Sequence, residues 1–109
     1  MSNKHTPGPW AYQEDSDAYT HIVRGPSNRF ICQLNQSTSA EIEANTRLIA
    51  AAPELLEVSK ELVRALELAY GIEDGYSDDR IYDELPSGSI ATAFISARAA
   101  IAKATGEGA

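Results

Sequence analysis

The sequence has little of several features that define classes of protein. Its single cysteine, Cys32, excludes an internal disulfide, which fits a reducing compartment. No run approaches the roughly 18 consecutive apolar residues that a membrane-spanning helix needs. The N-terminal segment MSNKHTPGPW also lacks the apolar stretch of a signal peptide. We therefore expect a soluble cytoplasmic protein with no membrane partner.

Basic residues are scarce as well. Nine Lys and Arg oppose 16 Asp and Glu, and the formal net charge is −7. The imbalance is strongest over residues 71–86, where Arg80 is the one base among six acids. A protein that follows the phosphates of a nucleic acid needs a basic stripe, so we do not expect direct nucleic-acid binding. An acidic surface instead suits a partner protein with a basic surface.

Motifs of catalysis and metal binding are missing too. His5 and His21 are the two histidines, and neither has a second ligand at metal-binding spacing. The chain contains no G-x-S-x-G elbow, no Walker loop and no G-x-G-x-x-G. Its acids do not follow the EF-hand spacing. We therefore expect a protein that is not an enzyme and carries no metal or cofactor.

The residues present predict an α+β fold in a single domain, 1–109. Three short strand patterns, at 9–13, 18–24 and 29–34, are separated by polar turns. Turns this short exclude parallel crossovers, so residues 1–37 predict a three-stranded antiparallel meander.

Alternation along these strands sorts the side chains into two faces. The expected core face carries Trp10, Tyr12, Ile22, Phe30, Cys32 and Leu34. The expected outer face carries Tyr19, His21, Val23, Arg29, Ile31 and Gln33. On that face Tyr19, His21, Arg29 and Gln33 combine rings, a guanidinium and an amide, which can hold a nucleotide-like ligand or a partner. The alternatives are an ordinary outer face, or a one-residue register shift that exchanges the faces.

Residues 38–70 show helical periodicity interrupted by one proline. Leu48, Leu55 and Leu62 recur with other apolar residues at offsets of three, four and seven. Pro53 cannot donate a backbone hydrogen bond, so we predict a Pro-bent helical segment over 38–70, made of two helices, about 40–51 and 53–70, that meet at a bend near Ala51-Ala52. Together with a C-terminal helix they are expected to pack on one sheet face.

The last third of the chain predicts an acidic loop and a final helix. The loop, 71–88, is expected to contain a short helical turn around 78–84 and to end in a helix at 89–105, closed by Gly106. The expected buried stripe of that helix is Ile90, Phe94, Ala97, Ile101 and Ala104. The acids that form a candidate partner surface are Glu73, Asp74, Asp78, Asp79, Asp83 and Glu84. The alternative interpretation is a solvated loop without a partner.

Three segments resemble a known group of proteins: HTPGPW at 5–10, ANTRLIAAAPELLE at 44–57 and ARAAIAKATGE at 97–107. They are similar to small, largely uncharacterised bacteriophage and prophage proteins with a TPGPW-like start and an N-A-R-L-I-A-A-A-P-E-L-L-like helix. The resemblance implies a phage accessory protein but no particular chemistry, because these motifs look structural.

Three functional hypotheses follow. The first is a non-enzymatic phage accessory protein in the host cytoplasm that binds a host protein, as an inhibitor of a host defence or nucleic-acid enzyme, through its acidic surface. The second is a protein that sequesters a small nucleotide-like ligand. The third is a minor enzyme or regulator. The oligomeric state is left open, although the mixed outer face and the alanine-rich helices suit a homodimer.

Overall fold

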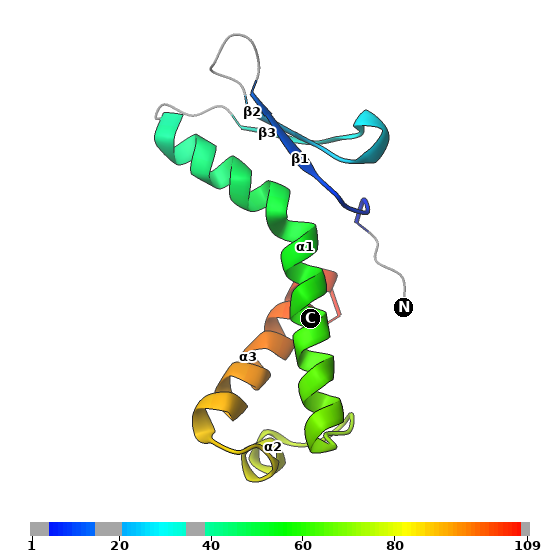
Figure 1. Ribbon diagram of the computed structural model, residues 1–109, viewed down its shortest axis with the longest axis vertical. Helices are drawn as coiled ribbons and strands as arrows, with labels where there is room; N and C mark the ends of the chain where they lie inside the picture. Colours follow the sequence, from blue (N-terminus) through cyan, green and yellow to red (C-terminus); the bar gives the residue numbers. More distant parts are fainter. Residues whose placement is uncertain (1–4, 15–20, 35–38, 108–109) are drawn as a thin grey trace. The chain divides into compact units, whose positions relative to one another are not determined.

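The elements follow the predicted order. A computed structural model describes residues 5–14, 21–34 and 39–107. The strands are β1 (Ala11–Glu14), β2 (His21–Arg24) and β3 (Phe30–Leu34), with the short 3-10 helix η1 (Pro26–Asn28) between the last two. The helices are α1 (Ser39–Tyr70), α2 (Asp78–Glu84) and α3 (Gly88–Thr105). An α+β fold, with a sheet followed by three helices, is thereby confirmed (Figure 1).

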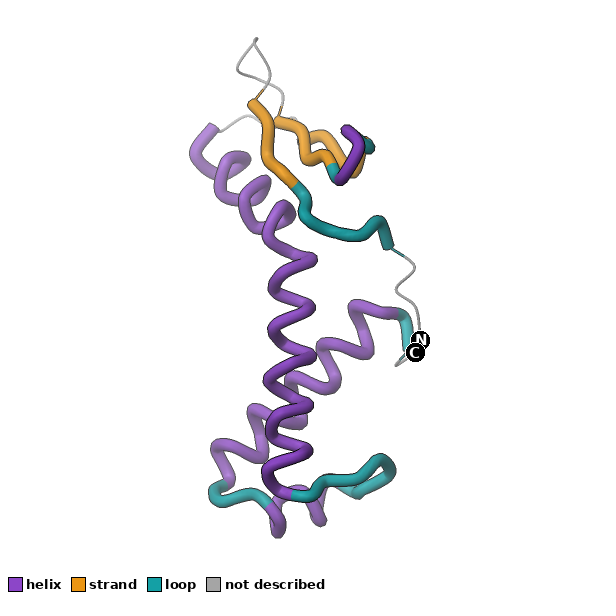
Figure 2. The backbone as a smooth tube through the Cα atoms, turned by 45° about the vertical axis from the view of Figure 1, so that its right-hand side comes forward, coloured by secondary structure: helices purple, strands orange, loops and turns teal. Residues whose placement is uncertain are grey.

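The chain groups into two compact units, which we call unit 1 (Met1–Leu55) and unit 2 (Leu56–Ala109). Unit 1 contains the sheet and the first half of α1, and unit 2 contains the second half of α1 with α2 and α3. Figure 2 colours the strands of the first unit and the helices of both. The sequence predicts a single domain, 1–109. Whether the two units form one domain is not tested by this division, so the single domain stays a prediction.

The sheet of unit 1 is antiparallel, in the order β1-β2-β3, as predicted. Tyr12 lies opposite Val23, and Val23 lies opposite Cys32. His21 lies opposite Leu34. Directly paired residues project from the same face, so these five side chains share one face. Tyr19 lies outside the described residues, as does most of the polar turn expected between the first two strands.

The predicted assignment of faces is therefore wrong for β2 and for Phe30. His21 and Val23 are fully buried, whereas Ile22 pairs with Gln33 on the opposite face. The register is irregular between Val23 and Arg24, because one step along β2 spans two residues of β3. This extra residue turns Phe30 away from the core, with 54% of its surface exposed.

Helix α1 is continuous across Pro53, so the predicted pair of separate helices is wrong. The proline withholds one hydrogen bond from the carbonyl of Ile49, a loss that costs up to about 3 kcal/mol inside a helix. The ring is buried and lies against Gly8, where an added Cβ would be 3.0 Å from the Pro53 Cβ. This contact brings together the proline-glycine segment at the start of the chain and the alanine-proline segment of α1.

The exposed side of α1 also differs from expectation. Ile42, Thr46 and Pro53 are buried in unit 1, at spacings that place them on one side of the helix. Leu48, Leu55 and Leu62, which were expected in the core, are exposed. Periodicity alone could not show which side of α1 is buried. The leucines recur every seven residues, a spacing as regular as that of Ile42, Thr46 and Pro53.

Among the described residues of unit 2, the core is entirely apolar. Its buried members are Val63, Ile72, Ile81, Leu85, Ala91 and Phe94. The expected stripe on α3 is thus right for Phe94, while Ala91 is buried in place of the exposed Ile90 and Ala104. Within the described residues, no helix has the length and apolar character required to cross a membrane.

The ends of the helices in unit 2 follow the sequence signals. Gly71 has φ 65° and ends α1, and the Ile72 amide donates to the Glu67 carbonyl at 2.9 Å. The Ser87 side chain accepts a hydrogen bond from the Ile90 amide at the start of α3. Gly106, with φ 77°, closes that helix. The predicted short helix around 78–84 is α2.

Candidate acidic binding surface

Helix α2 turns the acidic segment into an ordered surface. The Ser77 side chain caps it by accepting a hydrogen bond from the Arg80 amide at 3.2 Å. Asp78 and Asp79 occupy the first turn, where the helix dipole favours carboxylates. On the same helix, Ile81 is 1% exposed and belongs to the core of unit 2. The sequence therefore places exposed acids and one buried apolar anchor on the same short helix.

The six predicted acids are all exposed, and we call them the acidic surface. They are Glu73, Asp74, Asp78, Asp79, Asp83 and Glu84. The first two lie in the turn that joins α1 to α2, and the other four lie on α2. All six therefore lie exposed on one segment of unit 2, and their role as a partner surface stays a prediction.

Arg80 offsets little of this charge. Its guanidinium lies 4.0 Å from the centre of the Tyr76 ring, a cation–π contact. Its Nε is 3.9 Å from Glu84 Oε1, and both side chains are largely exposed, so that ion pair is weak. Since Arg80 is the only base between residues 71 and 86, the segment keeps a strong negative field.

Besides Ile81, two further contacts hold α2 in place. Leu85, at the C-terminal end of α2, is 5% exposed and belongs to the core of unit 2. The hydroxyl groups of Tyr82 and Thr92 are hydrogen bonded at 2.7 Å, which ties α2 to α3. An ordered surface loses less conformational entropy when a partner binds it than a free loop would.

The other predicted site is not assembled. His21 is buried on the inner face of the sheet, and Gln33 is exposed on the opposite face. Arg29 lies before β3, exposed, beside a cavity of about 410 Å³ that Thr6, Pro26 and Ser27 also line. The fourth member, Tyr19, lies outside the described residues. The structure therefore does not gather His21, Arg29 and Gln33 around one ligand.

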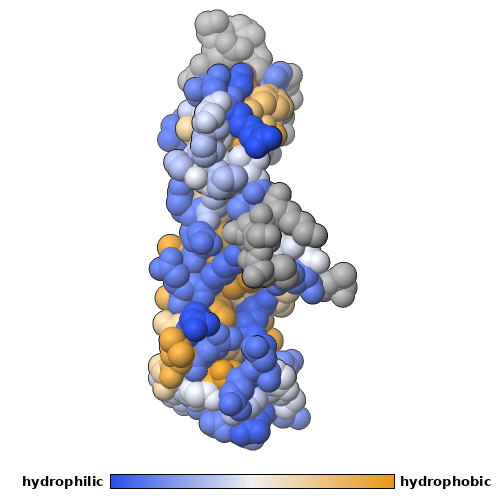
Figure 3. Space-filling model, turned by 90° about the vertical axis from the view of Figure 1, so that its right-hand side faces the viewer, coloured by the Kyte–Doolittle hydropathy of each residue, from blue (hydrophilic) through white to orange (hydrophobic). Residues whose placement is uncertain are grey.

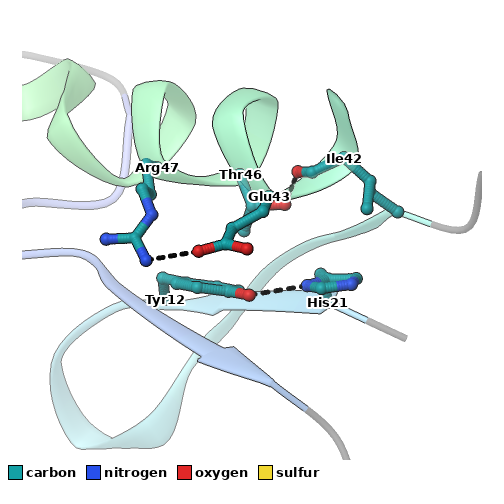
Figure 4. Close-up of polar contacts among 6 residues, drawn as sticks. All are labelled: Tyr12, His21, Ile42, Glu43, Thr46 and Arg47. Carbon is teal, nitrogen blue, oxygen red and sulfur yellow. Dashed lines mark hydrogen bonds and ion pairs between the residues drawn. The ribbon is translucent and has the colours of Figure 1, made fainter. Parts of the chain in front are cut away.

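His21 instead takes part in a polar cluster inside unit 1 (Figure 4). The Tyr12 hydroxyl and His21 Nδ1 are 2.7 Å apart, and the two rings stack at 5.6 Å. The Arg47 guanidinium from α1 lies 5.6 Å from the centre of the Tyr12 ring and is paired with Glu43. The hydrogen bond and charge of Glu43 raise the pKa of Arg47. Sequence reasoning missed this cluster because it assigned Tyr12 and His21 to opposite faces.

The remaining reactive group is the thiol of Cys32. Burial raises its pKa, and the backbone of Val23 opposes that shift by a hydrogen bond. A thiol with a raised pKa is a poor nucleophile at neutral pH. Among the residues that the structure describes, no three His, Cys, Asp or Glu side chains are grouped to hold a metal ion.

Comparison with known proteins gives one informative result. Residues 1–108 match the family described as Salmonella phage P22 protein Y8K6. Neither the curated proteins nor the solved structures include a match. Since the family match covers nearly the whole chain, this small phage protein belongs to the family of Salmonella phage P22 protein Y8K6.

Proposed function

We propose that this phage protein acts without catalysis, by binding a basic surface of a host protein through its acidic surface. The observation that supports this proposal is an ordered set of six exposed carboxylates with one engaged guanidinium among them. Charge of one sign on a fixed scaffold speeds encounter with an opposite charge and disfavours other partners.

The chemistry of the acidic surface also narrows the class of target. Enzymes that act on nucleic acids present Lys and Arg to phosphates. A helix with carboxylates on its exposed side offers the same charge to the same residues. The target in this proposal is therefore a host defence or nucleic-acid enzyme whose basic substrate channel the phage protein occupies.

The test is a charge reversal with a matched control. In the test variant Asp78, Asp79 and Asp83 become Lys, and in the control Glu54, Glu57 and Glu61 on the exposed part of α1 become Lys. Both variants change the net charge equally. Wild type and variants are each used to capture proteins from host lysate at two salt concentrations, and the affinity for the enriched protein is then measured.

The proposal expects a loss of affinity of about tenfold or more in the test variant only, because several charge pairs are reversed together. It also expects weaker binding at higher salt, and release of the target by excess duplex DNA. Equal affinity of the test variant and the wild type would overturn it. Because Lys at the first turn of α2 opposes the helix dipole, the corresponding Asn variant is measured alongside to separate charge from folding.

A further inference from the structure

A second candidate site lies in unit 2, away from the acidic surface. A groove of about 300 Å³ separates the second half of α1 from the C-terminal part of α3. This volume is at the lower end of the range found for sites of small ligands. None of the six carboxylates of the acidic surface lines it. In the lower part of Figure 3, which includes α2 and α3, hydrophobic surface is visible between hydrophilic side chains.

Helical spacing builds the groove from two matching sets of residues. On α1, Lys60 and Arg64 flank Val63, which also belongs to the core. On α3, Arg98 precedes Ile101 by three residues, so the two lie on one side of the helix. The lining thus combines apolar side chains with cationic side chains from both helices.

The cations at this groove are unusual for so acidic a chain. Five Lys and Arg lie in residues 56–109, against ten Asp and Glu, and three of the five line the groove. Among the described residues, neither Arg64 nor Arg98 forms an ion pair. The Arg98 guanidinium lies 5.3 Å from the centre of the buried Phe94 ring, which limits its orientations. Two guanidinium groups therefore retain their capacity to bind an anion.

Two acidic side chains in the lining limit the negative charge of a ligand that the groove could bind. Glu67 and Glu107 also line it, and neither is ion-paired among the described residues. With three bases and two acids the lining carries a net charge of +1. A ligand with one negative group satisfies the guanidinium groups, whereas a ligand with several negative charges also meets the carboxylates.

We propose that the groove binds a small organic monoanion with an apolar body, such as an aromatic or aliphatic carboxylate. Val63 and Ile101 contact the body, and Arg64 and Arg98 bind the carboxylate with charge-assisted hydrogen bonds. This proposal does not rest on the proposed function of the acidic surface, because the two sites share no residue.

The test uses the full chain and benzoate as the probe. Benzoate is titrated into isotope-labelled protein at constant ionic strength, and backbone amide shifts are followed by NMR. Benzamide and benzylamine, which have the same ring with a neutral or cationic group, are titrated in parallel. We expect saturable shifts at Val63, Ile101 and Ala102 with benzoate, and at least about fivefold weaker binding of the two analogues because they lack the carboxylate.

Variants separate the groove from general charge. Arg64→Gln with Arg98→Gln should weaken benzoate binding about tenfold, because both carboxylate-binding groups are lost. Arg80→Gln with Lys103→Gln changes the net charge equally at residues outside the groove and should leave the affinity unchanged. Since Arg98 contacts Phe94, the single variant Arg64→Gln is included as a change that leaves this contact intact. Equal binding of benzamide, an equal loss in the control pair, or no saturable shift would overturn the proposal.

Discussion

The two units of this chain stabilise their interiors by different means. In unit 1, His21 and Thr46 are buried together with Val23, Ile42 and Pro53. In unit 2, all the buried side chains among the described residues are apolar. Polar contacts depend on direction and distance, whereas apolar contacts depend mainly on the area and volume removed from water. The units should therefore respond differently to the same kind of mutation.

In the sheet of unit 1, the buried polar contact between Tyr12 and His21 helps to specify the register of the strands. Tyr12 lies opposite Val23, so His21 is its diagonal neighbour on the same face. A shift of β2 by one residue would turn His21 to the other face and break its hydrogen bond to Tyr12. Short strands of four or five residues have few other contacts that specify register. In unit 2 the Tyr82–Thr92 hydrogen bond joins α2 to α3, while the buried core is apolar and more tolerant of rearrangement.

The largest expected loss of stability comes from a mutation in the apolar core of unit 2. Phe94→Ala removes a side chain that is 1% exposed and should lower the free energy of unfolding by about 3–5 kcal/mol. The measurement is denaturant unfolding, with amide hydrogen exchange to localise the loss in residues 56–107. The same change at Phe30, which is 54% exposed, is the matched control and should cost about 1 kcal/mol or less. Equal costs at the two positions would contradict the assigned core.

A smaller effect is expected in the polar interior. His21→Ala removes the stacked ring and its hydrogen bond, and should cost about 2 kcal/mol. Tyr12→Phe keeps the ring of Tyr12 and removes its hydroxyl group, so it should cost about 1 kcal/mol. Unfolding of both single variants and the double variant gives the coupling energy. Additive costs would show that the two side chains do not act as a pair.

The positions of strands and helices along the chain were predicted better than the sides of these strands and helices that are buried. Turn residues and helix-stop glycines such as Gly71 and Gly106 act locally, so the strands, α2 and the ends of α3 were predicted within a few residues. The exposure of the six acids could also be predicted, because carboxylates are seldom buried without a partner. The inner face of the sheet was not, because an irregular register and a hydrogen bond between distant residues decide it. A local pattern predicts a break at Pro53, and it cannot show that the proline packs against Gly8, near the start of the chain.

The smallest expected effect concerns the second buried polar residue of unit 1. The Thr46 hydroxyl donates to the carbonyl of Ile42 on the same helix at 2.6 Å, so it joins no second element. Thr46→Ala gains helix propensity but loses a buried methyl group and the hydroxyl with its hydrogen bond, so the net cost should be about 1 kcal/mol. Thr46→Val keeps the volume and should be nearly neutral in thermal unfolding. A cost for Thr46→Val as large as that of His21→Ala would contradict the distinction between a local hydrogen bond and one that joins two strands.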